Sequence, residues 1–405
     1  MASATTLELL PTAEPVHVRT RIRPGELQQQ EQQSAPRLAF QFTGTGSEYF
    51  RIWVVNLLLT ILSCGIYSAW AKVRRLRYVY RNTRVDGAIF DYHGKPSAIL
   101  KGRLLVVVFL IVYKVASELS ALAGAGVALV LIALVPWLLA RSFRFRLLNS
   151  SYRGLRFRFG GTAGGAYRML GLIPVLAGLA AFFVWNVAFT PAERIGKGTL
   201  LIGGLLLVTM LVTIPLAHFL LKRFQHDNAY FGNAPFFFHA KKAGFVKVYA
   251  QSVGFLVLGS VSAGVFGFLT NKLFTALQAT MFGWLFALFY GVVSAYAFYL
   301  FVRPFLESRL QNLVWNHTEL AGHRFASRAS ARRLLWLHAT NLAFTTLSLG
   351  LYKPFATMRL MKYKVESLVL LPDGKLEDFM RADVGDNAGA MGQEAGDLFD
   401  LEIAL

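Results

Sequence analysis

Two residues of opposite charge lie inside the apolar stretch LIVYKVASELSAL, and their spacing allows them to interact. Lys114 and Glu118 are four residues apart, so on a helix both side chains share one face at ion-pairing distance. Burying either charge alone in hydrocarbon is costly, and the pair is expected to face protein or water. One interpretation is a polar path or proton-coupling site. The alternative is a structural ion pair near the outer membrane interface, since both residues fall late in the segment.

The same spacing recurs at Lys247 and Gln251, early in a later apolar stretch. Enzymatic patterns are missing, because the sequence has no HExxH, GxSxG or GxxxxGK[ST] motif. A single cysteine, Cys64, excludes a paired-cysteine metal site, and the histidines are scattered along the chain. We therefore expect no catalytic residue, no cofactor and no metal site, in a chain that is not an enzyme.

The composition indicates a membrane protein. Hydrophobic residues make up 55% of the 405 and charged residues 16%, and the mean hydropathy is +0.46. Soluble domains carry about a quarter charged residues. The apolar residues lie in long runs that reach the ~20 residues needed to cross a bilayer. Three pairs of runs stand out, at roughly 103–121 with 123–141, 169–190 with 199–221, and 245–270 with 276–302, flanked by shorter runs at 51–70 and 334–356.

The positive charge is concentrated between these pairs. The four stretches 72–103, 141–168, 222–247 and 303–333 hold 27 Lys and Arg residues, whereas the connections inside the pairs hold only Arg194, Lys197 and Lys272. Basic loops stay in the cytoplasm, so this asymmetry places the four stretches there. The formal net charge of +20 is explained in this way, and no nucleic-acid partner is expected because no recognition motif accompanies the arginines.

The stretches between the pairs resemble one another and predict an internal repeat. Counted from Ala69, Pro136, Pro215, Pro304 and Pro354, most copies place Arg about five, Asn about thirteen and Gly about eighteen positions on. Proline kinks the helix, and Asn and Gly end it. The alternating residues after Gly, as in LRFRFGG and AIFDYHG, predict a short cytoplasmic β-hairpin.

The two ends of the chain contain versions of one segment. NLLLTILSCGIYSAWAKVRRLRY (56–78) and NLAFTTLSLGLYKPFATMRLMKY (341–363) share residues at the same offsets, 285 positions apart. Gly65 and Gly350 occupy matching positions and are predicted turns. We favour a re-entrant end unit, in which a short helix turns at Gly and returns to the cytoplasm. The alternative is a plain span, since Ile52 to Ala71 is uncharged and long enough.

Cations alternate with aromatic residues in WAKVRRLRY, FRFRLLNSSYRGLRFRF and KRFQHDNAYFGNAPFFF. Each cation near an anionic bilayer gains about 1 kcal/mol, so this belt predicts binding of anionic lipid headgroups on the cytoplasmic face. Protein partners and oligomeric state are left open. The interfacial candidates are Arg74, Arg75, Arg77, Arg141, Arg309 and Arg359.

The string FTGTGSEYFRIWVVNLLLTILSCGIYSAWAKVRRLRYVYRNTRVDGAIFDYHGKPSAILKGR closely resembles the start of the YjgN family of bacterial inner-membrane proteins, a domain of unknown function. The resemblance is specific over about residues 40–103, and the multi-span layout is in keeping with it to about 370. It implies a polytopic inner-membrane protein and transfers no catalytic or binding residues.

Together these observations predict an all-α polytopic membrane protein. We expect a helical bundle of about six full spans plus two short end units, built from internal repeats, with short cytoplasmic β-hairpins between helix pairs. Residues 1–36 are expected to be a disordered tail, 37–370 the transmembrane domain, and 371–405 an acidic disordered tail, with both termini cytoplasmic. The leading function is transport or gating of a small or lipidic solute; the alternative is a scaffold or lipid-organising protein acting through its basic aromatic surface.

Overall fold

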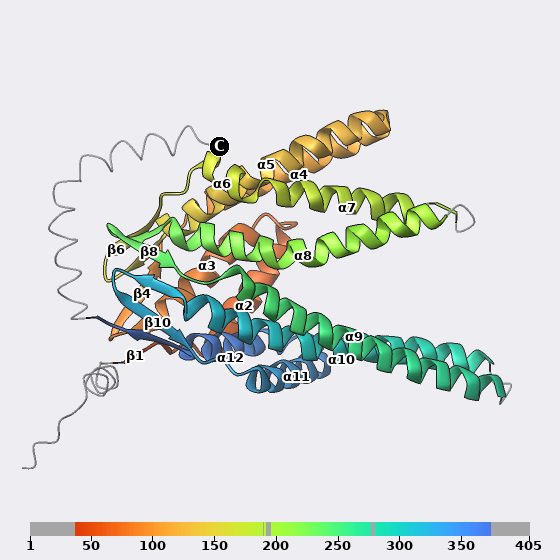
Figure 1. Cartoon of the computed structure of the whole chain (residues 1–405). Helices are drawn as coiled ribbons and strands as arrows, with labels where there is room; N and C mark the ends of the chain where they lie inside the picture. The colour runs from red at the N-terminus through yellow and green to blue at the C-terminus, as the bar shows by residue number, and fades with distance from the viewer. Residues whose placement is uncertain (1–36, 189, 192–195, 277–279, 374–405) are drawn as a thin grey trace, which may run out of the picture. The chain divides into compact units, whose positions relative to one another are not determined.

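The computed structural model describes residues 37–188, 190–191, 196–276 and 280–373. The chain divides into two units, Met1–Pro36 and Arg37–Leu405, and the first lies outside the described residues, as does most of the predicted acidic tail. Within the second unit the strands gather at one end and the long helices project from them (Figure 1).

The chain alternates helix pairs with strand pairs. The helices are α2 (Gly46–Leu62), α3 (Ser68–Arg81), α4 (Pro96–Leu119), α5 (Ala121–Leu148), α6 (Ala163–Leu170), α7 (Leu172–Ala188), α8 (Lys197–Asp227), α9 (Lys242–Ala276), α10 (Thr280–Trp315), α11 (Ala331–Leu347) and α12 (Lys353–Glu366). The strands are β1 (Leu38–Ala39), β2 (Gln41–Phe42), β3 (Thr83–Val85), β4 (Ala88–Tyr92), β5 (Ser150–Tyr152), β6 (Leu155–Phe159), β7 (Ala229–Phe231), β8 (Ala234–Phe238), β9 (Thr318–Leu320), β10 (His323–Ser327) and β11 (Leu368–Leu371).

Each passage from helix to hairpin uses the same local chemistry. The side-chain amides of Asn82, Asn149 and Asn228 donate to the carbonyl oxygen four residues earlier, at 2.7 to 2.9 Å, and so end α3, α5 and α8. Two-residue turns then join the strands. In Asp86–Gly87 and Ala321–Gly322 both residues have positive φ, the geometry that matches the twist of a tight hairpin.

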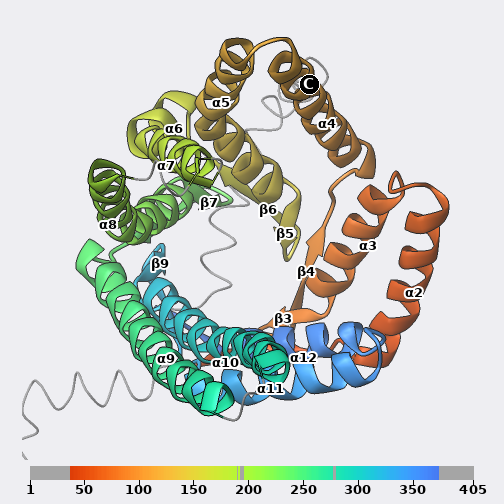
Figure 2. The same ribbon diagram turned by 90° about the vertical axis from the view of Figure 1, so that its right-hand side faces the viewer.

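The hairpins join into one antiparallel sheet of 11 strands, in the order β1-β11-β10-β9-β8-β7-β6-β5-β4-β3-β2. Its two edge strands, β1 and β2, are separated in the chain only by Phe40. The segment 38–42 therefore pairs with β11 through its first half and with β3 through its second half. This pairing nearly closes the sheet into a barrel. The helices follow one another around it, and α12 packs against α2 (Figure 2).

The predicted all-α bundle of six full spans is wrong. The strands form a single near-barrel sheet rather than separate small hairpins, because partners from neighbouring hairpins are invisible in a local sequence pattern. Among the described residues only α5, α8 and α9 are long and apolar enough to cross a membrane, and a fourth span exists if α6 and α7 count as one helix bent by 52°. The predicted span at 103–121 corresponds to α4, where Arg103, Lys114 and Glu118 interrupt the apolar run.

The two end units are helical hairpins with matching turns. Gly65 and Gly350 both have φ of +92°, a conformation that glycine adopts at little cost. The hydroxyls of Ser63 and Ser348 each accept from the backbone N–H four residues on, at 2.8 and 2.9 Å. The first helix of each unit has 17 residues, about 25 Å of rise, which is less than the ~30 Å hydrocarbon thickness.

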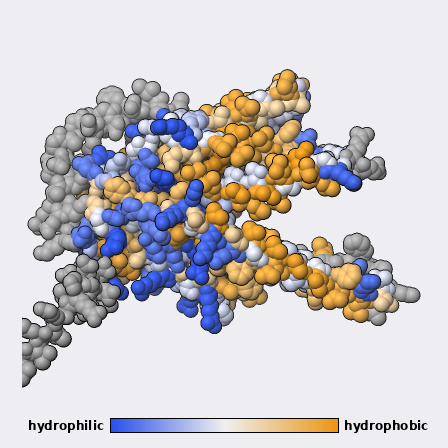
Figure 3. Space-filling view, viewed as in Figure 1, coloured by the Kyte–Doolittle hydropathy of each residue, from blue (hydrophilic) through white to orange (hydrophobic). Residues whose placement is uncertain are grey.

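Hydrophobic and hydrophilic residues separate along the projecting helices. Figure 3 shows hydrophobic residues over the long helices and hydrophilic residues over the end that carries the strands. The hydrophobic windows of α5 and α8 are only 11% and 6% buried by the rest of the chain. Surfaces this apolar are stable in lipid rather than in water.

Candidate functional site

Five phenylalanines meet inside the barrel in a closed circle of ring contacts. Neighbouring ring centroids are 6.3 to 6.5 Å apart all the way round, within the range of favourable aromatic pairs. We call this circle the phenylalanine ring; in order of contact it consists of Phe40, Phe90, Phe157, Phe236 and Phe325.

The regular spacing of the strands positions this ring. Phe90, Phe157, Phe236 and Phe325 are each the third residue of a five-residue strand, β4, β6, β8 and β10. Phe40 takes the equivalent place in the segment 38–42. Alternate residues of a strand face opposite sides, so all five side chains point to the interior of the barrel.

The ring is not a fully buried core. Phe236 and Phe325 are each 9% exposed, whereas Phe40, Phe90 and Phe157 keep intermediate exposure. The residue beside Phe236, Phe237, faces outward and is 46% exposed. An apolar aromatic constriction can in general act as a barrier to water and ions.

A second constellation joins three helices through one carboxylate. Glu307 on α10 contacts Arg303 at 2.9 Å, His338 on α11 at 3.2 Å and Lys364 on α12 at 3.0 Å. Burial alone would raise the pKa of Glu307, but the hydrogen bonds from these three side chains lower it to about 2. The cluster ties the C-terminal end unit to α10.

This cluster predicts a specific pH dependence of stability. Because the pKa of Glu307 is lowered from 4.5 to about 2 on folding, its stabilising contribution is present above about pH 4.5 and lost as the pH falls toward 2. The thermal midpoint of Glu307→Gln should therefore lie below that of the native protein at pH 7, with a gap that shrinks toward pH 3.

The matched control is Glu366→Gln, because Glu366 forms an exposed pair with Lys362 at 3.9 Å. Its midpoint should follow the native protein at every pH. A Glu307→Gln gap that stays constant between pH 7 and 3, measured by scanning fluorimetry in detergent, contradicts the prediction.

Lys114 and Glu118 contact each other at 3.0 Å near the end of α4, and their side chains are 77% and 66% exposed. Lys247 and Gln251 lie on α9, and both are exposed on one face of it. Among the described residues, no hydrogen bond or ion pair links either pair to the Glu307 cluster.

The six predicted interfacial arginines divide into three groups. Arg141 and Arg309 are exposed and lie over the rings of Trp137 and Phe305, at 5.0 and 5.6 Å. Arg75 and Arg77 are exposed on α3, and Arg77 donates to the Tyr92 carbonyl at 3.4 Å.

Arg74 and Arg359 form the third group and stabilise the two end units alike. Arg359 donates to the Asn341 side chain at 3.0 Å, and Arg74 donates to the Asn56 side chain at 3.5 Å. Both asparagines are buried, 8% and 7% exposed. The two similar end segments thus form similar helical hairpins, each stabilised by a hydrogen bond from an arginine to a buried asparagine.

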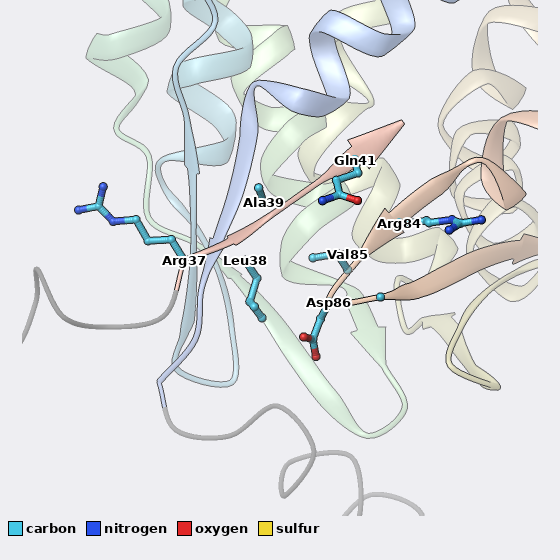
Figure 4. A pocket seen from close by; sticks show the side chains of 8 residues that line it. Arg37, Leu38, Ala39, Gln41, Arg84, Val85 and Asp86 are labelled. Carbon is cyan, nitrogen blue, oxygen red and sulfur yellow. The ribbon is translucent and has the colours of Figure 1, made fainter. Parts of the chain in front are cut away.

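A small cavity of about 250 Å³ lies at the seam of the barrel, where the N-terminal segment meets β3 (Figure 4). Its polar lining residues are Arg37, Gln41, Arg84 and Asp86. Asp86 is engaged by Arg153 at 2.7 Å, so this carboxylate stabilises the neighbouring hairpin. Among the described residues no group of three or more His, Cys, Asp or Glu side chains gathers as a metal site would require.

Sequence reasoning missed the phenylalanine ring, although a signal for it exists. Phe is the central residue of five short stretches, LAFQF, AIFDY, LRFRF, APFFF and HRFAS. From the sequence alone, AIFDY and LRFRF are interpreted as strands of hairpins, and LRFRF and APFFF as parts of a headgroup-binding belt. Their common central Phe becomes informative once the strands are placed side by side in one sheet.

The chain matches the family model described as a bacterial protein of unknown function (DUF898) over residues 37–398. It is 28% identical over 346 residues to the inner membrane protein YjgN of Salmonella typhimurium. The aligned region covers 80% of this chain and 86% of that protein. It is 33% identical over 162 residues to the inner membrane protein YjgN of Escherichia coli strain K12. That aligned region covers 39% of this chain and 40% of that protein. No solved structure is significantly similar to this chain.

These matches confirm the resemblance seen in the sequence. The family model covers most of the chain, and both relatives carry the name of an inner membrane protein. No enzymatic family is among the matches described above. This protein is a bacterial inner-membrane protein and belongs to the DUF898, or YjgN, family of unknown function.

Proposed function

We propose that this inner-membrane protein moves a small or lipidic solute along the axis of its β-barrel, with the phenylalanine ring as the gate. The closed circle of five ring contacts carries this proposal. A narrow apolar constriction opposes the passage of water and ions until its side chains move. Four of the inward side chains come from separate hairpins and the fifth, Phe40, from the segment 38–42. These side chains can move together when the helix pairs that precede the strands shift.

The five helix-pair and hairpin units support this proposal, and we interpret them as internal repeats. Transport proteins often place their pathway on the axis that relates such repeats. Here that axis passes through the barrel, where each unit contributes one phenylalanine. The fifth unit is completed by the two ends of the described chain, β11 and the segment 38–42.

Widening the gate should increase passage. Phe90→Ala combined with Phe157→Ala removes two neighbouring rings, and it should raise potassium chloride conductance in planar bilayers, or the transbilayer movement of fluorescent phosphatidylglycerol in liposomes, by about tenfold or more. Phe237→Ala is the matched control, because this outward phenylalanine is also on the sheet but not in the ring.

The competing function is a scaffold that organises lipids through its basic aromatic surface. The exposed Arg141 and Arg309, each over an aromatic ring, favour this candidate. A scaffold has no use for an axial gate. If the double phenylalanine variant matches the native protein in both assays, the conduit proposal is wrong and the scaffold is favoured.

A further inference from the structure

Cationic side chains from three helices, α3, α4 and α5, lie near one another. Ser68, Lys72 and Arg75 on α3 follow the helical spacing of four and three residues, so they share one face. The guanidinium of Arg103 on α4 donates to the Ser68 hydroxyl, which brings Arg103 against this face.

Arg146, near the end of α5, is held beside the same helix. Its carbonyl oxygen accepts from the Ser150 hydroxyl at 2.8 Å, and that hydroxyl lies 3.2 Å from the hydroxyl of Tyr80 on α3. Partial burial and the charges of Arg103, Arg146 and Arg75 lower the pKa of the Lys72 ammonium. Each of these three arginines is therefore close enough to Lys72 to act on its charge.

The described residues contain nine carboxylates, and each of them engages a group outside this cluster. Four lie in ion pairs with an arginine, two in pairs with a lysine, and one beside each of His239, Tyr78 and His323. None of the ion pairs among the described residues includes Lys72, Arg75, Arg103 or Arg146.

We propose that Lys72, Arg75, Arg103 and Arg146 form a binding site for a phosphate group. Guanidinium groups match phosphate oxygens in a bidentate fork, and the lysine adds a compact charge. The phosphate comes either from the headgroup of an anionic membrane phospholipid or from inorganic phosphate. Such a site would make the solute of the proposed conduit a phosphate-bearing molecule. Binding does not depend on the proposed function, but the movement of the bound molecule does.

The site is tested by direct binding in detergent. Lys72→Gln with Arg75→Gln removes two cations whose side chains are exposed, so the fold should be retained. Native mass spectrometry should show phosphatidylglycerol bound to the native protein and bound at least about tenfold more weakly by this variant. The matched control, Arg332→Gln with Arg333→Gln, removes two exposed cations from the start of α11 and should bind as the native protein does.

Inorganic phosphate, titrated by calorimetry, separates the two sources. If phosphate binds the native protein and the Lys72→Gln, Arg75→Gln variant weakens this binding, free phosphate is the ligand. If neither phosphatidylglycerol nor phosphate distinguishes that variant from the control, the site is overturned. If Lys72→Gln with Arg75→Gln weakens binding but Phe90→Ala with Phe157→Ala leaves passage unchanged, the conduit proposal is wrong and the phosphate site stands. If the phenylalanine variant raises passage but the cation variant binds as the control does, the phosphate site is wrong and the conduit proposal stands.

Discussion

A chain that ends at Ser367 is expected to lose its cooperative fold, whereas a chain that ends at Asp373 is expected to keep it. The two differ by six residues that contain β11. Size-exclusion chromatography in detergent and a thermal melt measure the difference. The longer chain should elute as one species with a sharp melt, and the shorter one should aggregate or melt without a transition.

The reason is that β11 closes the barrel. It pairs with β10 along four residues and with β1 along two, so its loss exposes the hydrogen-bonding edges of two strands. Unpaired edges favour aggregation. Leu370 on β11 is 5% exposed in the barrel core, and removal of a buried leucine side chain alone costs about 2 to 5 kcal/mol.

The two truncations also test the near-barrel itself. If the chain that ends at Ser367 melts at the same temperature as the chain that ends at Asp373, closure by β11 does not stabilise the fold.

Local features of this fold could be predicted from the sequence because short-range chemistry determines them. The asparagines that end α3, α5 and α8 bond to carbonyl groups four residues away. The glycines at 65 and 350 occupy left-handed conformations in turns. In both cases every interacting group lies within a few residues, so a spacing in the sequence is enough to indicate the structure.

Long-range features could not be predicted, because their partners are distant in the chain. Phe40 and Phe325 are neighbours in the phenylalanine ring, and Leu38 pairs with Leu370. No hydropathy window connects such residues. The pairing of β1 with β11 joins four hairpins, β11 and the segment 38–42 into a nearly closed sheet. A residue-by-residue interpretation therefore missed both the architecture and the ring.

The candidate charges show the same limit. Lys114 and Glu118 were singled out because they are four apart, and the structure places them in contact with each other at 3.0 Å. The cluster of Lys72, Arg75, Arg103 and Arg146 draws on three helices, and only the helix packing brings its members together. Sequence spacing identified charge pairs within one helix, but it could not identify a site built between helices.

Phe224→Ala is expected to destabilise the protein by about 3 to 5 kcal/mol, the usual cost of removing a fully buried aromatic side chain. Phe224 on α8 is 1% exposed. Its ring contacts those of Phe159 on β6 and Phe143 on α5, with centroids 5.5 and 6.4 Å away.

The control for this substitution is Phe237→Ala, which removes the same side chain from a position that is 46% exposed and should change stability by only about 0.5 kcal/mol. Chemical denaturation in detergent measures both free energies of unfolding. Equal losses in the two variants would contradict the packing described here. Phe159, which contacts Phe224, is two residues from Phe157 on the same strand. A cavity at Phe224 should therefore also loosen the phenylalanine ring and raise the potassium chloride conductance. This result would link the stability of the helix-to-strand junction to the proposed gate.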